Sequence, residues 1–406
     1  MDADVVIIGA GPSGSVAAAM LVDAGLDVEV LERAHFPRFS IGESLLPQAM
    51  EWLEEAGLLQ DVIEAGFQHK NGATFRYGDK EQSFDFRKKS AEGWGTTYQV
   101  RRDRFDALLA QGAERKGARF RFGQTVVDMR PDPAAPTLRV RDEAGEERSV
   151  TARFVLDASG FGRVLARLLD LERPSTFPGR VSLFKHVRDR IRADSFDRNK
   201  ILISVNPHNA QIWYWLIPLA DGISSVGVVG RPEEIAANGE TPEEQFAALV
   251  AQSGRMSHLL EQAEPVREVQ GISGYSCSVC RLAGDGYALL GNAGEFLDPV
   301  FSSGVTIALK SANLASKLVA RQLAGDTPDW DREVAEPLGR GVDTFRAYVN
   351  GWYDGSLQRV IFNPPADPNT IKSMITSVLA GYAWDEANPF VQKPEKYLKL
   401  VEGLCS

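Results

Sequence analysis

The residues best suited to do chemistry in this chain begin near its N-terminus. Gly9, Gly11 and Gly14 give the spacing G-x-G-x-x-G directly after the apolar run 5–8. In a strand–turn–helix unit the first glycine makes the tight turn, the second lets a pyrophosphate approach the backbone, and the third lets the helix pack on the strand. Glu32 ends a second predicted strand, where a carboxylate accepts hydrogen bonds from ribose hydroxyls. These residues predict a nucleotide site, which also includes two further members of the turn, Pro12 and Ser13.

The segment after Glu32 groups polar side chains in a loop. Residues 33–47 hold two prolines, a glycine and clustered arginine, glutamate and serine side chains, a composition typical of a structured loop. A surface connector would explain this composition. Alternatively, the loop lies against the nucleotide, with an arginine near its negative charge and a glycine that allows close backbone approach. The second interpretation assigns five residues to the site: Arg33, Arg38, Gly42, Glu43 and Ser44.

A second predicted anion site lies in the last third of the chain. An apolar strand ends at Gly291, small residues lead to Asp298, and Ser303 and Gly304 open a long predicted helix. The N-terminus of such a helix has free N–H donors and a positive dipole end, which suit a phosphate or a halide ion. This segment therefore adds five residues to the nucleotide site: Asn292, Asp298, Pro299, Gly304 and Val305.

Charged residues at two other element boundaries extend the same site. Asp103 is the predicted N-cap of a helix, and Arg101 and Arg104 near its start could hold a phosphate or a ribitol chain. A solvated basic face is the alternative for these arginines. Farther on, an apolar strand ends at Asp157 and Gly160, which indicates that the chain has returned to the nucleotide sheet.

Lys70 has unusual neighbours for a lysine. It lies in a strand-like segment among apolar and glycine residues, whereas a solvated lysine usually has polar neighbours. A simple surface lysine remains one interpretation. The other is a side chain in a cavity, where desolvation lowers the pKa of the amine and makes it reactive. His69 is predicted to be structural, because strand alternation points it away from Lys70.

Two tryptophans mark a long predicted strand in the middle of the chain. By alternation Trp213, Trp215 and Ile217 share one face, and Pro218 ends the segment without a backbone donor. The two indoles are interpreted either as a core stripe or as the wall of a cavity. Alternating runs before and after this segment predict an antiparallel sheet that could floor such a cavity.

Composition excludes several classes of protein. The chain has 406 residues, is 44% hydrophobic and carries a net charge of −10, which argues against a nucleic-acid partner. No apolar run reaches the roughly 18 residues of a membrane span, and the first strand begins too early for a signal peptide. Three cysteines suggest a reducing cytoplasm. Cys277 and Cys280 have no second pair, so we expect structural cysteines and no metal site.

Four segments of the chain carry a resemblance to a known family. Residues 9–14, 36–47, 157–160 and 298–305 resemble FAD-dependent monooxygenases of the hydroxybenzoate-hydroxylase fold. Within that superfamily they are most similar to the flavin-dependent halogenases and their geranylgeranyl-reductase-like relatives. Trp-Tyr-Trp-Leu-Ile-Pro at 213–218 matches the W-x-W-x-I-P signature of the halogenases. Lys70 lies where that family has its essential lysine.

The resemblance implies a reaction. Reduced FAD reacts with oxygen to give a C4a-hydroperoxide, and a chloride or bromide ion held by the N–H groups of Ser303 and Gly304 attacks it to give hypohalous acid. Lys70 then either hydrogen-bonds this acid or forms a haloamine with it, and so presents electrophilic halogen to an electron-rich ring. A tunnel wall keeps this substrate away from the flavin, and its predicted members are Trp213, Trp215 and Pro218.

The resemblance also implies partners. No nicotinamide-binding domain is evident, so reduced FAD is expected from a separate flavin reductase. The chain lacks the extended C-terminal domain of the tryptophan-specific enzymes, which favours a phenolic, pyrrolic or carrier-protein-bound aromatic substrate. Asn292 replaces an aspartate that the family usually has near the ribitol. Two alternatives remain: a monooxygenase, dehydrogenase or double-bond reductase of the same fold, and a flavin-binding or electron-transfer protein without catalysis.

The expected architecture is α/β, with a Rossmann-like FAD-binding domain, an inserted antiparallel-sheet substrate domain and a helical C-terminal segment. The C-terminal aromatic residues are expected to pack over the substrate sheet, and a lid over the substrate is the alternative. The predicted boundaries are 1–65, 98–172 and 275–330 for the FAD-binding domain, 66–97 and 173–274 for the substrate domain, and 331–406 for the C-terminal segment.

Overall fold

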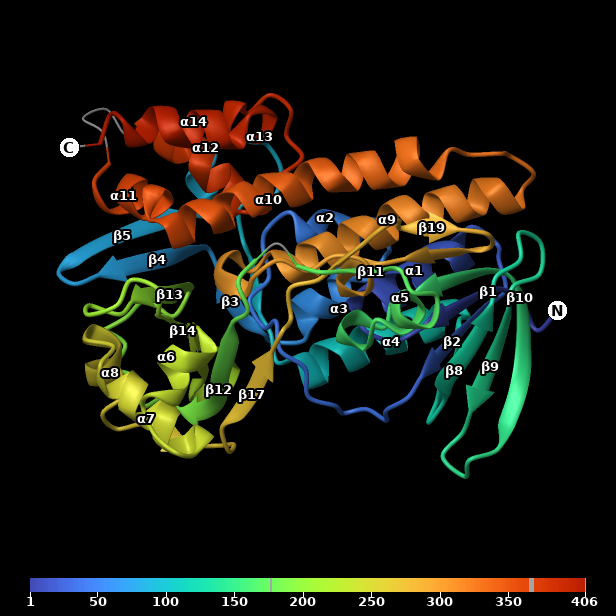
Figure 1. The fold of residues 1–406 in the computed structure, drawn as a ribbon, viewed down its shortest axis with the longest axis horizontal. Helices are drawn as coiled ribbons and strands as arrows, with labels where there is room; N and C mark the ends of the chain where they lie inside the picture. The colour runs from blue at the N-terminus through green and yellow to red at the C-terminus, as the bar shows by residue number, and fades with distance from the viewer. Residues whose placement is uncertain (176, 365–368, 406) are drawn as a thin grey trace.

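The computed structural model describes residues 1–175, 177–364 and 369–405, and it is built on two large sheets that lie side by side (Figure 1). The first sheet has the order β19-β20-β10-β1-β2-β7, and its pairs from β20 to β7 are parallel. β8 and β9 extend it through the N-terminal half of β10. The bounds are β1 Ala3–Ile8, β2 Val28–Glu32, β7 Arg119–Phe122, β8 Thr125–Arg130, β9 Thr137–Arg141, β10 Glu147–Asp157, β19 Ala283–Gly284 and β20 Tyr287–Leu289.

Three helices cover one part of this sheet and bring the predicted nucleotide segments together. α1 (Pro12–Asp23) packs against both α4 (Arg102–Lys116) and α9 (Ser303–Leu323). Their buried faces form one core with the apolar residues of β1 and β2, which have almost no exposed surface. A mainly parallel sheet covered by helices confirms the predicted α/β class.

The second sheet has the order β16-β12-β15-β14-β13-β4-β5, with β17 beside β12. Its neighbouring strands are antiparallel except β13 and β4, which run parallel. The predicted antiparallel arrangement is confirmed for the strands around the tryptophans, β12 to β15, and β4 joins β13 in parallel from a distant early segment. The bounds are β4 Gly72–Tyr77, β5 Lys80–Asp85, β12 Val181–Arg188, β13 Lys200–Val205, β14 Trp213–Pro218, β15 Ile223–Gly230, β16 Glu264–Pro265 and β17 Gln270–Ser273.

Both faces of the second sheet are buried. Trp213, Trp215 and Ile217 of β14 face a core that they share with the C-terminal helices, whereas Tyr214 and Leu216 face a core on the opposite side. The alternation predicted for these residues is thus present. The opposite core is closed by α6, α7 and α8, whose bounds are Pro232–Ala236, Pro242–Ala251 and Arg255–Leu259.

The C-terminal segment is helical and packs over the tryptophan face. Figure 1 shows α11 to α14 above the second sheet, with α10 running beside α9. Phe345, Tyr348 and Trp352 of α10 belong to the same core as Trp213 and Trp215. Among the described residues, no helix is long and apolar enough to cross a membrane. The bounds are α10 Glu336–Asp354, α11 Ser356–Phe362, α12 Asn369–Leu379, α13 Pro389–Gln392 and α14 Pro394–Glu402.

Two helices follow Pro47, α2 (Ala49–Glu55) and α3 (Leu59–Glu64), and Gly57 between them has a φ of +67°. One local prediction is wrong. Asp103 does not cap α4, which begins one residue earlier. Its carboxylate instead accepts hydrogen bonds from the Arg101 guanidinium.

The packing of α10 against Trp384 gives a prediction about stability. A Cβ added at Gly341 would lie 2.1 Å from the Trp384 ring, so Gly341→Ala must displace a packed indole and should cost about 1–3 kcal/mol. A Cβ at Gly339 of the same helix meets open space, and the better helix propensity of alanine should make Gly339→Ala neutral or stabilising. Thermal unfolding of the two variants measures the difference; equal midpoints would contradict this packing.

Candidate functional site

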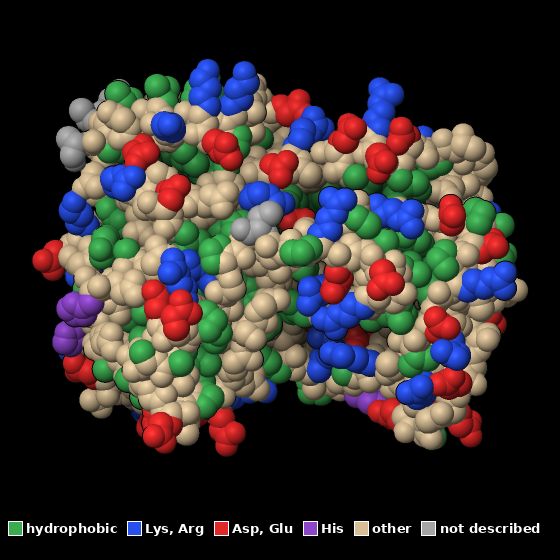
Figure 2. All heavy atoms as spheres, in the orientation of Figure 1, with side chains coloured by type: hydrophobic (Ala, Val, Ile, Leu, Met, Phe, Trp, Pro, Cys, Tyr) green, Lys and Arg blue, Asp and Glu red, His purple; other side chains and the backbone are tan. Residues whose placement is uncertain are grey.

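A cavity of about 810 Å³ lies between the two sheets and is called the inner cavity here. Its wall takes residues from the glycine turn, from the loop after β2, from the tryptophan strand and from the start of α9. Figure 2 shows the surface hollowed between the two halves of the molecule, with Lys and Arg side chains gathered beside the hollow. Segments far apart in the sequence therefore meet at one site.

The glycine turn has no room for side chains. Gly9 has a φ of +100°, and a Cβ there would lie 2.7 Å from the Ala158 carbonyl oxygen. A Cβ at Gly14 would lie 2.0 Å from the Gly9 carbonyl oxygen. Pro12 is the first residue of α1, so the helix begins inside the turn rather than after it. Gly11, Pro12 and Ser13 at this helix start line the inner cavity, and the N-terminus of a helix has free N–H donors that suit a pyrophosphate.

Glu32 lines the inner cavity and is held by the backbone. One carboxylate oxygen accepts a hydrogen bond from the Ala10 N–H at 2.9 Å, and the other accepts one from the Ala34 N–H at 3.0 Å. Arg38 pairs with the first oxygen at 3.4 Å. Since each carboxylate oxygen has two lone pairs, Glu32 keeps capacity for ribose hydroxyls.

Arg102 is a wall residue that the sequence analysis missed. It forms two hydrogen bonds to Asp106, at 2.7 and 3.0 Å, and donates to the Ile41 carbonyl at 2.7 Å. Arg38 shares the same Asp106 carboxylate at 3.1 Å. The helix begins at Arg102, so this side chain reaches back to the loop. The i,i+4 spacing of an arginine and an aspartate was the available signal.

Arg101 and Arg104, the two arginines predicted to hold a phosphate or ribitol, lie away from the inner cavity. The Arg101 guanidinium bonds to the Asp103 carboxylate, and the Arg104 guanidinium donates to the Ala65 carbonyl at 3.1 Å. Neither residue lines the inner cavity. Asp157 also lies behind the wall, where burial raises the pKa of its carboxyl and where it accepts hydrogen bonds from Ser159 and Leu165 N–H groups.

The start of α9 forms the opposite wall. Asn292 and Gly304 line the inner cavity, and the buried Oδ1 of Asn292 has no hydrogen-bond partner among the described residues. Asp298 lies behind, where it accepts hydrogen bonds from the Val300 N–H and from the Tyr353 hydroxyl. Burial raises the pKa of Asp298 to about 6. Because the Asn292 Oδ1 has no partner within the described chain, it can accept a hydrogen bond from a ligand.

The two indoles lie side by side on the wall. The rings of Trp213 and Trp215 are 5.9 Å apart, and Phe184 lies 6.0 Å from Trp215. The Trp215 indole N–H donates to Ser225 Oγ at 3.2 Å. The Trp213 indole N–H donates to the Tyr353 hydroxyl at 2.9 Å, so the ring is fixed from outside the cavity.

Lys70 is fully buried but does not line the inner cavity. Its ammonium group donates to Ser44 Oγ at 2.6 Å and to the Leu45 carbonyl at 2.8 Å, and it lies 5.3 Å from the Phe86 ring centre. Burial lowers the pKa of the amine to about 7. Ser44 does line the cavity, so one hydrogen bond separates the amine from the wall.

The predicted residues divide into two groups. Those that line the inner cavity are Gly9, Gly11, Pro12, Ser13, Glu32, Arg33, Arg38, Gly42, Glu43, Ser44, Gly160, Trp213, Trp215, Asn292, Pro299, Gly304 and Val305. Those outside its lining are Gly14, Lys70, Arg101, Arg104, Asp157, Pro218, Asp298 and Ser303. Apolar wall residues from several strands were missed, because a face of a sheet gives no sign of what it faces: Phe184, Ile201, Ile203, Ile217 and Ile272.

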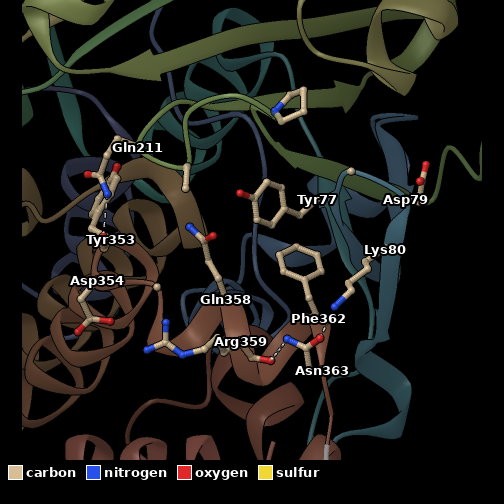
Figure 3. A pocket seen from close by; sticks show the side chains of 14 residues that line it. Tyr77, Asp79, Lys80, Gln211, Tyr353, Asp354, Gln358, Arg359, Phe362 and Asn363 are labelled. Atoms are coloured by element: carbon tan, nitrogen blue, oxygen red, sulfur yellow. Dashed lines mark hydrogen bonds between the residues drawn. The ribbon is translucent and has the colours of Figure 1, made fainter. Parts of the chain in front are cut away.

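An outer cavity of about 670 Å³ lies beyond Tyr353 (Figure 3). Tyr353 lines it together with Tyr77, Gln211 and Phe362, and the Gln211 side-chain amide donates to the Tyr353 carbonyl at 2.9 Å. Because the Tyr353 hydroxyl holds Trp213, a single side chain lies between the outer cavity and the tryptophan wall.

The inner cavity suits a dinucleotide. The glycine turn leaves a cradle that side chains would fill, and the unpartnered Asn292 Oδ1 and Arg38 Nε provide an acceptor and a donor. Glu32 stands at the end of β2, the position typical of a ribose ligand. The residues present therefore fit FAD.

Comparisons with known proteins agree with this fit. A family described as FAD binding domain matches residues 2–330. The 1H-pyrrole-2-carbonyl-[peptidyl-carrier protein] chlorinase of Pseudomonas fluorescens is 32% identical over 345 residues, which cover 78% of this chain and 75% of that protein.

Solved structures share the fold over almost the whole chain. A flavoprotein/dehydrogenase from Cytophaga hutchinsonii is 42% identical with a TM-score of 0.95, covering 99% of this chain and 98% of that one. The flavin-dependent brominase Bmp2 is 26% identical with a TM-score of 0.83, covering 98% of this chain and 99% of that one.

The glycine turn gives a prediction on cofactor binding. Gly14→Ala places a Cβ 2.0 Å from a backbone oxygen, so we expect lower thermal stability together with loss of bound FAD. Gly11→Ala makes only an ordinary 3.8 Å contact with Arg38, so the apoprotein should stay as stable while its affinity for FAD falls at least tenfold. Fluorescence titration with FAD and thermal unfolding separate the two. Unchanged affinity in Gly11→Ala would contradict a pyrophosphate at this turn.

Proposed function

This chain belongs to the flavin-dependent halogenases, FAD-dependent oxidoreductases with the FAD-binding domain matched over residues 2–330, and from that premise we propose that it halogenates an electron-rich aromatic substrate. One observation carries the proposal. Lys70 is a buried amine with a pKa near neutrality, and Ser44 holds it behind a wall that also contains Trp213 and Trp215.

The glycine turn and the start of α1 would hold the pyrophosphate of FAD, and Glu32 would hold a ribose. The loop around Gly42 and the segment around Pro299 would flank the remainder of the cofactor. When bound, reduced FAD supplies the electrons with which oxygen converts a halide ion to hypohalous acid.

The halide ion would bind at the start of α9. Gly304 lines the inner cavity, and Ser303 precedes it as the first residue of this long helix. Backbone N–H groups at a helix start attract anions, and their charge stabilisation grows where water is excluded. Chloride and bromide both fit this description.

Lys70 would carry the halogen. Its neutral amine displaces hydroxide from hypohalous acid: an N–halogen bond forms, the O–halogen bond breaks, and one amine proton leaves with the hydroxide as water. Attack by the aromatic ring then forms the carbon–halogen bond and breaks the N–halogen bond, and the proton lost by the ring restores the amine. Trp213 and Trp215 would hold the ring away from the flavin.

The substrate and partners belong to the same proposal. A phenolic or pyrrolic ring, free or bound to a carrier protein, has the electron density that electrophilic halogen needs. The matched pyrrole relative is named for a carrier-bound ring. A separate flavin reductase would supply reduced FAD.

A dehydrogenase of the same fold is the second candidate. The flavoprotein/dehydrogenase from Cytophaga hutchinsonii has the highest identity among the proteins compared above, and Asn292 replaces the usual carboxylate. Reduced FAD, oxygen and bromide supplied with an activated phenol distinguish the two candidates. Brominated phenol supports the halogenase; FAD reduction by an added substrate without any brominated product supports the dehydrogenase.

Removal of the amine tests the role of Lys70. Lys70→Met keeps a similar buried volume but cannot form an N–halogen bond, so we expect bromination to fall at least 100-fold while FAD still binds. Lys185→Met, which changes a lysine of β12 paired with Glu243, is the matched control and should retain activity. Full bromination by Lys70→Met would remove this residue from the mechanism.

The lowered pKa of Lys70 predicts a pH dependence. The amine is neutral above about pH 7 and protonated below it, so a step that needs its lone pair slows as the pH falls. We expect kcat/KM for bromination to decline by about tenfold per pH unit below that value. Assays between about pH 5.5 and 8.5 measure this, and a rate that is flat across pH 7 would contradict it.

A further inference from the structure

A chain of hydrogen bonds joins the tryptophan wall to the segment before α9. The Trp213 indole N–H donates to the Tyr353 hydroxyl at 2.9 Å, and that hydroxyl donates to Asp298 Oδ2 at 2.9 Å. The direction is fixed, because an indole nitrogen only donates and the tyrosine proton is left for the carboxylate. Burial raises the pKa of Tyr353 well above its ordinary value, so the hydroxyl keeps this proton. Three elements that are distant in the sequence therefore meet at one hydroxyl group.

Asp298 caps the turn that leads into α9. Its Oδ1 accepts a hydrogen bond from the Val300 N–H at 3.0 Å, at the start of a short 3₁₀ turn over Pro299–Phe301. This turn ends at Ser302, whose φ of +57° lies in the left-handed region that a serine rarely adopts. Such a conformation persists only where the surrounding structure holds it. The helix α9 begins at the next residue, Ser303, so the cap fixes the approach to its first turn.

Tyr353 is itself held from the side of the outer cavity. Figure 3 shows Gln211 beside it, and the Gln211 side-chain amide donates to the Tyr353 carbonyl at 2.9 Å. The Arg180 guanidinium packs on the Tyr353 ring, with its central carbon 3.5 Å from the ring centre. Arg180 also donates to the Gln211 carbonyl at 3.0 Å. Both faces of this contact are thus fixed, and the hydroxyl stays directed at Asp298.

Arg180 provides a buried positive charge near this turn. The residue is 4% exposed, and within the described chain its guanidinium bonds to two oxygens of Gln211 and to no carboxylate. Burial raises the pKa of Asp298 to about 6, and hydrogen bonds from the Val300 N–H and the Tyr353 hydroxyl, together with the Arg180 charge, oppose that rise. Arg180 therefore compensates an ionised Asp298, so an anion at the start of α9 does not face an unbalanced carboxylate.

A second tyrosine of α10 shows that burial alone does not explain these contacts. Tyr348 is fully buried in the same helix, yet its hydroxyl has no hydrogen-bond partner among the described residues. The Tyr353 hydroxyl instead bonds to the tryptophan wall and to the cap of the turn before α9. Its contacts are therefore specific to the two segments that surround the inner cavity.

We propose that Tyr353 is a positioning residue of the halide site. Its hydroxyl holds the Asp298 carboxylate, and the carboxylate holds the turn up to Ser302. The turn in its place positions the N–H groups of Ser303 and Gly304, which the proposed function assigns to the halide ion. The inference rests on that proposed function, and Tyr353 itself touches neither the halide ion nor the substrate.

Tyr353→Phe tests the hydroxyl, because the change keeps the aromatic ring. We expect KM for bromide, in the bromination of an activated phenol, to rise about tenfold or more, the contribution of a hydrogen bond to a charged group. Because only positioning changes, kcat at saturating bromide and the affinity for FAD should stay within about threefold of wild type. Tyr348→Phe is the matched control, since it removes a hydroxyl without a partner from the same helix and should leave KM for bromide unchanged. Thermal unfolding checks that both variants fold.

A double-mutant cycle locates the effect. Asp298→Asn offers one acceptor oxygen to two donors, the Val300 N–H and the Tyr353 hydroxyl, so it should also raise KM for bromide. The double variant Asp298→Asn with Tyr353→Phe should lie within about threefold of the weaker single variant, because both changes remove the same hydrogen bond.

Several outcomes would overturn the inference. These are an unchanged KM for bromide in Tyr353→Phe, an equal rise in Tyr348→Phe, and fully additive effects in the double variant. A rise confined to KM for the phenol would overturn it as well, since the hydroxyl would then act through Trp213. A wild-type enzyme that does not brominate would refute the halogenase function together with this inference. Normal wild-type kinetics with an unaffected Tyr353→Phe variant would refute the inference alone.

Discussion

Burial of the Lys70 amine is the constraint on which the site depends. An ammonium group without water is costly, and here only two neutral oxygens, Ser44 Oγ and the Leu45 carbonyl, accept its hydrogen bonds. No carboxylate compensates the charge among the described residues within salt-bridge distance. Burial therefore favours the neutral amine, and the loop that holds it must stay in place for the amine to stay buried.

That loop is in turn held by charged side chains. Arg102 donates to the Ile41 carbonyl and bonds to the buried Asp106 carboxylate, to which Arg38 also bonds. Buried ion pairs of this kind add little net stability, but removing one partner leaves an uncompensated charge. In this structure their main effect is to hold the loop in place. The N-terminal half of α4 fixes the loop that carries Ser44, and so it fixes the wall of the inner cavity that this loop forms.

Much of this arrangement could be predicted from the sequence. The glycine turn, the carboxylate at the end of β2 and the alternation of Trp213 and Trp215 all depend on neighbours a few residues away, and local spacing records such neighbours. The break at Asn71 could not be predicted, although it decides where Lys70 points. It leaves Lys70 in β3 (Gln68–Lys70), which pairs with β6 (Thr97–Gln99), while Gly72 begins β4 in the large sheet.

Contacts between residues far apart in the sequence explain why other residues of the site were not predicted. Arg102 was overlooked in favour of its neighbours because Asp103 was expected to be the N-cap, two residues after the observed N-cap Arg101, which left Arg102 outside the predicted helix. The buried pair of Glu43 and His186, in which Oε1 and Nε2 are 2.7 Å apart, gave no signal at all in the sequence. A histidine in an alternating strand is equally consistent with a structural role, and its partner Glu43 is 143 residues away in the sequence.

The fold alone does not select the reaction, since one architecture hosts many chemistries. Selection must come from side chains on or directly behind the cavity wall. The two indoles close one side of the inner cavity, and Ser44 on its wall holds the Lys70 amine behind it. The proposed halogenation uses a neutral amine at this wall and requires that rigid elements hold it there. The alternative dehydrogenase reaction would have no use for such a lysine.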